Sequence, residues 1–103
     1  MADDENMEQE MDAQAEMAKL LTSVKDMALY NLSVVSSQAW HHLGLVPIPG
    51  AGEVKVDLDQ AKLAIDLYEA NLNVMESSIE SEMVKQLKQA LADMQLNYVN
   101  KSK

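Results

Sequence analysis

The chain contains no cysteine, no phenylalanine and no arginine. Without cysteine, disulfides, thiolate catalysis and cysteine metal sites are excluded, and a reducing compartment such as the cytoplasm is the expected location. All eight basic residues are therefore lysines. Because phosphate recognition depends on arginine forks and a positively charged surface, nucleic acid binding is not expected.

Aromatic residues are also scarce, at 4% of the chain, although 48% of it is hydrophobic. The apolar residues are mainly leucine, methionine, valine and alanine, and this mixture favours helices over strands. A length of 103 residues fits one domain. The composition therefore predicts a single all-α domain with an aliphatic core.

Negative charge is concentrated at the N-terminus. The formal net charge is −9, and residues 1–16 hold seven of the acids and no base. We expect 1–16 to be an acidic tail, either disordered or extending the first helix, and 17–103 to be one helical domain. Such a tail can act as a solubilising arm or attract basic partners.

A long uninterrupted hydrophobic run is lacking as well. The stretch from Met27 to Gly52 has no Asp, Glu, Lys or Arg, but its prolines and many polar residues, including His41 and His42, make it too polar to cross a bilayer. The acidic N-terminus does not match a signal peptide, which begins with positive charge. We expect no export signal and no membrane insertion.

The first helix is predicted from Met17 to Leu43. Apolar residues recur there at threes and fours, at Met17, Leu20, Leu21, Val24, Met27, Ala28, Leu32, Val35, Ala39 and Leu43. Such a helix would be about 40 Å long, against about 31 Å for the diameter of a compact domain of this size. The projecting apolar face predicts a homo-oligomer, with a dimer favoured.

The predicted helix ends in a loop rich in proline and glycine. Gly44 follows the periodic run and Pro47 comes soon after, which is the usual signature of a helix end. Pro47 and Pro49 cannot donate backbone hydrogen bonds. A short β-hairpin that pairs residues 46–48 with residues 54–56 is the alternative to an irregular loop.

Two further helices complete a predicted three-helix bundle. Asp57 and Gln60 form a capping-box pattern before an apolar stripe that continues to Met75. Ser77 and Glu80 form a second such pattern before the last helix.

His41, His42 and Trp40 are the candidates for chemistry. Adjacent helical residues point about 100° apart, so both histidines cannot bind one ion while the helix persists, and no histidine pair has zinc-helix spacing. We expect one histidine to be exposed and the other to border the core. Trp40 either closes the core over the loop near Pro47 or Ile48, or anchors a partner.

Carboxylates give no stronger candidate for catalysis. Asp57 is explained by capping, and Asp66 by an ion pair with Lys62 one helical turn earlier. The GAG stretch lacks the pattern of a phosphate-binding loop and is expected to be a turn. We therefore predict neither a catalytic residue nor a cofactor.

The run SSQAWHHLGLVPIPGAGEVKVDLDQAKLAIDL, residues 36–67, resembles the small bacterial family catalogued as domain of unknown function 1844. That family shows the signatures QA-x₃-LG-x₂-P-x-P and DL-x₂-A-x₃-ID, and the resemblance covers roughly residues 29–99. The matching residues are Gln38, Ala39, Leu43, Gly44, Pro47, Pro49, Asp57, Leu58, Ala61, Ile65 and Asp66.

Two stretches depart from the family. NVMESSIESEM stands where members usually carry KT-x-GNLT-x-EE, and Gln95 and Leu96 stand where arginine tends to precede the final YV. The resemblance implies an all-helical fold and no particular reaction. It also suggests that Gln38 and Asp66, both polar and both within the motif, form a buried hydrogen bond.

The sequence thus predicts a non-catalytic interaction or structural module that self-associates and binds another, unidentified protein. The residues expected to carry this structural role are Gln38, Trp40, Leu43, Gly44, Pro47, Pro49, Asp57 and Asp66. The alternative is a ligand or metal site, enzymatic or not, at Trp40, His41, His42 and the following loop.

Overall fold

The computed structural model describes residues 2–103, with side chains described from Glu10 onward, and it is all-α. Within residues 2–103 there is no β-strand, so residues 46–48 and 54–56 do not pair as a hairpin and lie in an irregular loop. The helical elements are α1 (Ala2–Thr22), α2 (Val24–His42), α3 (Leu58–Met75), the 3₁₀ turn η1 (Glu76–Ser78) and α4 (Ser81–Lys101).

The prediction of one continuous first helix, and hence of three helices, is wrong. The helix is interrupted at Ser23, so that α1 and α2 are separate. Ser23 is extended, with φ −118° and ψ 110°, and its side chain accepts a hydrogen bond from the Asp26 N–H at 3.2 Å. Serine is a preferred N-cap because its hydroxyl satisfies a free N–H of the first turn. The apolar stripe continues through the break, so periodicity alone does not reveal it.

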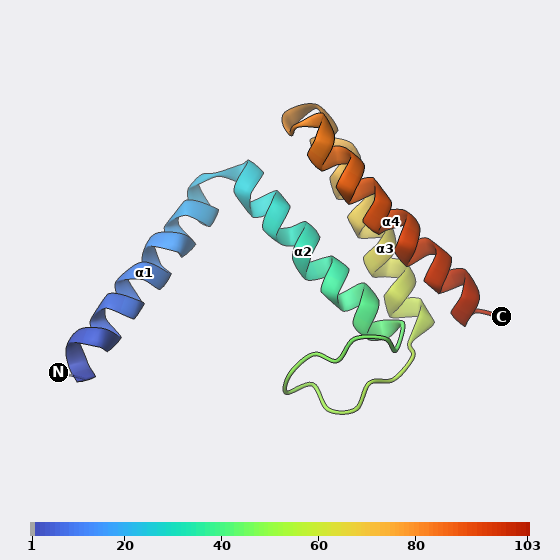
Figure 1. Ribbon diagram of the computed structural model, residues 1–103, viewed down its shortest axis with the longest axis horizontal. Helices are drawn as coiled ribbons and strands as arrows, with labels where there is room; N and C mark the ends of the chain where they lie inside the picture. The colour runs from blue at the N-terminus through green and yellow to red at the C-terminus, as the bar shows by residue number, and fades with distance from the viewer. Residues whose placement is uncertain (1) are drawn as a thin grey trace.

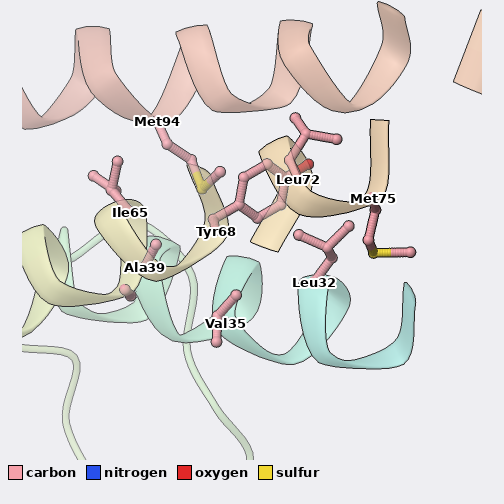
Figure 2. Close-up of a cluster of buried hydrophobic side chains, with 9 residues drawn as sticks. Leu32, Val35, Ala39, Ile65, Tyr68, Leu72, Met75 and Met94 are labelled. Atoms are coloured by element: carbon pink, nitrogen blue, oxygen red, sulfur yellow. The ribbon is translucent and has the colours of Figure 1, made fainter. Parts of the chain in front are cut away.

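The core lies between α2, α3 and α4 (Figure 2). α2 and α3 contribute buried residues at spacings of three and four, and α4 adds Met94 with partly buried Leu87 and Leu91 beside it. The buried cluster consists of Leu32, Val35 and Ala39 from α2, Ala64, Ile65, Tyr68, Leu72 and Met75 from α3, and Met94 from α4. The predicted apolar stripe that continues to Met75 therefore faces the core.

α3 is the central element, since it packs against both α2 and α4. The chain turns back after η1, so that α4 runs alongside α3 (Figure 1). The side-chain amide of Asn71 on α3 donates to the carbonyl of Ala28 at 3.0 Å, which ties α3 to the first turns of α2.

α1 projects away from the other helices (Figure 1). The radius of gyration is 16.7 Å, and the molecule extends 56 Å along its longest axis. A compact domain of about 100 residues has a radius of gyration near 13 Å. The excess arises because α1 extends away from the other helices, and none of its described side chains, from Glu10 onward, belongs to the buried cluster.

The second predicted capping box is not formed. Ser77 lies in η1, and α4 begins after Glu80, which takes the N-cap position without a side-chain hydrogen bond. Glu76 instead forms an ion pair with Lys88 of α4. Because Ser77 lies within the 3₁₀ turn, it cannot take the N-cap position of α4.

Tyr68 gives the core a pH-sensitive contact. Its hydroxyl donates to the carbonyl of Leu87 on α4 at 3.0 Å, and burial raises the pKa of its phenol above the ordinary value of 10.0. Desolvation disfavours the phenolate, so the folded protein holds the proton more tightly than the unfolded chain does. The contribution of this group to stability is complete below pH 10 and is lost as pH rises through the raised pKa.

We expect Tyr68→Phe to lower the free energy of unfolding by about 0.5–1.5 kcal/mol near neutral pH, through the lost hydrogen bond. The difference between wild type and variant should narrow above pH 10, because only the wild type has this group to titrate. Urea unfolding across pH 7–11 measures both effects. A difference that stays constant with pH would show that the Tyr68 phenol has the same pKa in both states.

Candidate functional site

The C-terminus of α2 is closed by a Schellman motif. The N–H of Gly44 donates to the carbonyl of His41 at 2.9 Å, and the N–H of Leu45 donates to the carbonyl of Trp40 at 3.1 Å. Gly44 has φ +79°, the left-handed conformation that glycine adopts without strain. Leu43 is buried. This turn sends the following loop sideways from the helix axis.

The loop of residues 43–57 is fastened at its base. The backbone N–H of Asp57 donates to the carbonyl of His42 at 2.8 Å, joining the two ends of the loop. Asp57 also accepts a hydrogen bond from the Gln60 N–H at 3.1 Å, which confirms the predicted N-cap of α3. In Figure 1 the loop leaves the end of α2 and returns to the start of α3 as one wide turn.

Both histidines are half-buried at this corner, which differs from the expectation of one exposed ring and one bordering the core. Nδ1 of His41 lies 3.2 Å from the carbonyl oxygen of Val46. Because a carbonyl only accepts, Nδ1 must carry a proton and donate. The two imidazole rings meet edge to face, with centroids 5.1 Å apart. His41 thereby holds the start of the loop against α2.

Trp40 is half-buried and packs against the core cluster. Its backbone carbonyl accepts from Leu45 and from Val46, so the residue contributes to the helix end as well as to the core.

The predicted contact between Gln38 and Asp66 is wrong. Both side chains are exposed, and Asp66 instead pairs with Lys62 at 3.2 Å, one turn earlier on α3. The two residues lie on different helices, each on a face turned to solvent. The motif therefore places two polar residues on the surface, and the described core contains no buried polar side chain.

A groove runs between α2 and the first part of the loop. Its volume is about 570 Å³. None of the residues that line it carries a charge. They are Tyr30, Ser33, Val34, Ser37 and Gln38 from α2, and Val46, Pro47, Ile48 and Pro49 from the loop. We call this surface the α2–loop groove.

The groove unites three of the predicted site residues, Gln38, Pro47 and Pro49. Asp66 lies elsewhere, in a shallow hollow between α3 and α4 with Gln95 and Tyr98. Sequence reasoning missed the α2 side of the groove. The signal was present, because Tyr30, Val34 and Ser37 recur at spacings of four and three on a face without charge.

Two further findings concern the described part of the chain. From Glu10 onward, no three residues among His, Cys, Asp and Glu come together as they would to hold a metal ion. The described helices also include none that is long and apolar enough to span a membrane. The α2–loop groove is a recess lined by uncharged residues.

Most of the described helices fall within a known protein family. The model of the family described as domain of unknown function 1844 matches residues 32–100, which include most of α2, the loop, α3 and nearly all of α4. The chain belongs to this family. The match leaves out α1 and the first turns of α2. Comparison with curated proteins and with solved structures found no match.

Proposed function

We propose that this chain is a non-catalytic protein–protein interaction module of the cytoplasm that self-associates and thereby presents a surface to another protein. The α2–loop groove carries the proposal, because it combines a recess of about 570 Å³ with an uncharged lining. Tyr30, Val34 and Val46 are exposed there. Interface cores are depleted in charged residues, and this lining has none and includes the aromatic ring of Tyr30.

The loop itself supports the proposal. The Schellman motif, the His41 contact and the Asp57 hydrogen bond to His42 fix both ends of the loop before any partner arrives. A surface that is already ordered loses little conformational entropy on binding, so more of its contact energy contributes to affinity.

Val34→Lys tests the proposal. A lysine in the middle of a buried neutral interface loses its hydration without gaining a partner, so we expect self-association to weaken by about tenfold or more. Sedimentation equilibrium of the wild type and variant measures this. Val74→Lys is the matched control, because Val74 is 80% exposed on α3 and lies outside the groove.

Circular dichroism should show both variants folded. A wild type that stays monomeric at about 50 μM would overturn the self-association, since a homodimer of useful affinity forms at such protomer concentrations. Stoichiometric metal in the purified protein, or a change in function on His41→Ala without loss of folding, would favour a ligand or metal site instead.

A further inference from the structure

The bend between α1 and α2 is held by few contacts. Ser23 alone separates the two helices, and its side chain caps α2 through the Asp26 N–H. An ion pair joins Lys19 to Asp26 across the bend at 4.0 Å, and the lysine side chain is 74% exposed, so water screens the pair. Inside the bend the helices leave a hollow of about 330 Å³ instead of a packed contact.

The backbone on both sides of Ser23 already has the pattern of a continuous helix. The Ser23 N–H donates to the Lys19 carbonyl, and the Met27 N–H donates to the Ser23 carbonyl, both at 3.0 Å. These are the bonds between residues four apart that an α-helix makes. Between them, the N–H groups of residues 24–26 leave the pattern. Rotation of Ser23 from φ −118° and ψ 110° to helical values would return them to it.

Apolar side chains next to the bend lack a cover. Val24 is 87% exposed and Leu21 is 71% exposed. At about 100° per residue, a straight helix would place both within about 40° of Ala28, which packs against the core cluster. Residues 20–24 include no charged side chain. Straightening would therefore turn an uncharged, largely apolar turn toward the same side as the buried residues of α2.

The antiparallel register of α2 and α3 shows what this turn would meet. At one end of the pair Asp57 bonds to His42. At the other end Asn71 bonds to Ala28, so each chain advances by fourteen residues between the two contacts. Continuing the register places Leu21 opposite η1. In Figure 1 the turn between α3 and α4 extends past the start of α2, while α1 points away from it.

We propose that Ser23 is a hinge about which α1 swings between the bent position of this structure and a straight position in line with α2, where Leu21 and Val24 pack on η1. The bent form keeps the Ser23 cap. The straight form replaces the cap with backbone hydrogen bonds and buries apolar surface, so the two forms exchange one set of contacts for another. The hinge sets the direction of the acid-rich residues 1–16, and it does not depend on the self-association proposed above.

Distances between spin labels test the hinge in the full-length protein, because the chain has no cysteine of its own. Glu10→Cys and Asp59→Cys carry the labels, since both positions are exposed and lie outside the α2–loop groove. The register places residue 59 level with residue 40, so a straight helix separates the labels by about 45 Å at 1.5 Å per residue, and a bend shortens this distance. An excess of unlabelled protein restricts double electron–electron resonance to distances within one chain.

Ser23→Ala removes the cap and favours helix at this position, so we expect the ratio of long to short distances to rise about tenfold over wild type. Ser23→Asn is the matched control. Asparagine caps a helix as well as serine does, and the ratio should change by less than about twofold. Adding Leu21→Ser to Ser23→Ala should bring the ratio back toward the wild-type value, because the apolar contact with η1 is lost. Circular dichroism should show all variants folded.

The other outcomes count against the hinge. A short distance alone in every variant would overturn it, as would a long distance alone in the wild type. Equal ratios for Ser23→Ala and Ser23→Asn would also overturn it, because the cap would then not hold the bend. A long distance that Leu21→Ser leaves unchanged would overturn the contact with η1.

Discussion

Leu72→Ala should lower the free energy of unfolding by about 2–5 kcal/mol, the largest effect that we expect from a single substitution. Leu72 lies on the central helix α3, where it is almost completely buried among side chains of the core cluster. Removing most of its side chain loses the burial of apolar surface and leaves a cavity that neighbouring helices fill only in part. Chemical unfolding followed by circular dichroism measures the loss.

Leu96→Ala provides the comparison for this prediction. Leu96 lies on α4 and is 60% exposed, so the same truncation should change the free energy of unfolding by less than about 1 kcal/mol. Similar losses for both variants would mean that α3 is not the centre of the core.

The second large effect is expected at Gly44. Its φ of +79° is costly for any residue with a Cβ, and a Cβ built there would lie 2.8 Å from Cγ2 of Val56. Left-handed backbone costs about 1–2 kcal/mol for a non-glycine residue, and the displacement of Val56 adds to it. We expect Gly44→Ala to lower the free energy of unfolding by about 2–3 kcal/mol, given that overpacking typically costs about 1–3 kcal/mol.

Gly50→Ala separates the two causes. Gly50 has φ +83°, close to that of Gly44, but no atom lies within 4 Å of where its Cβ would be. Its alanine variant should therefore show the backbone cost alone. Adding Val56→Ala to Gly44→Ala removes the contacting methyl and should recover part of the loss. Equal losses at Gly44 and Gly50 would rule out any contribution from Val56.

The sequence correctly predicted features that depend only on contacts between residues close together in the chain, such as the start of α3. Asp57 caps α3 because its side chain reaches an N–H three residues away, a contact that needs no tertiary structure. The break at Ser23 was missed because the apolar periodicity on both sides stays in phase. Ser77 and Glu80 had the spacing of a capping box, but Ser77 lies in a 3₁₀ turn and Glu80 caps α4 without a side-chain hydrogen bond.

The groove could not be predicted because it depends on the path of the loop. The sequence marked Pro47 and Pro49 as loop residues, but it did not show against which side of α2 they would lie. The structure places them beside Tyr30 and Ser37, through the turn at Gly44. The proposed bond between Gln38 and Asp66 failed for a related reason, since membership of one motif does not put two residues on facing surfaces.

The hydrogen bond between the Asp57 N–H and the His42 carbonyl has a consequence for how this chain can vary. It holds the C-terminal end of α2 next to the N-terminal end of α3, independently of the residues in the loop between them. Beyond Pro49, residues can be added or removed at the tip without reorienting α2 and α3, because each doubling of a flexible segment costs only about 0.6 kcal/mol in closure entropy. The length and shape of the loop tip can thus change while the packing of α2 against α3 stays the same.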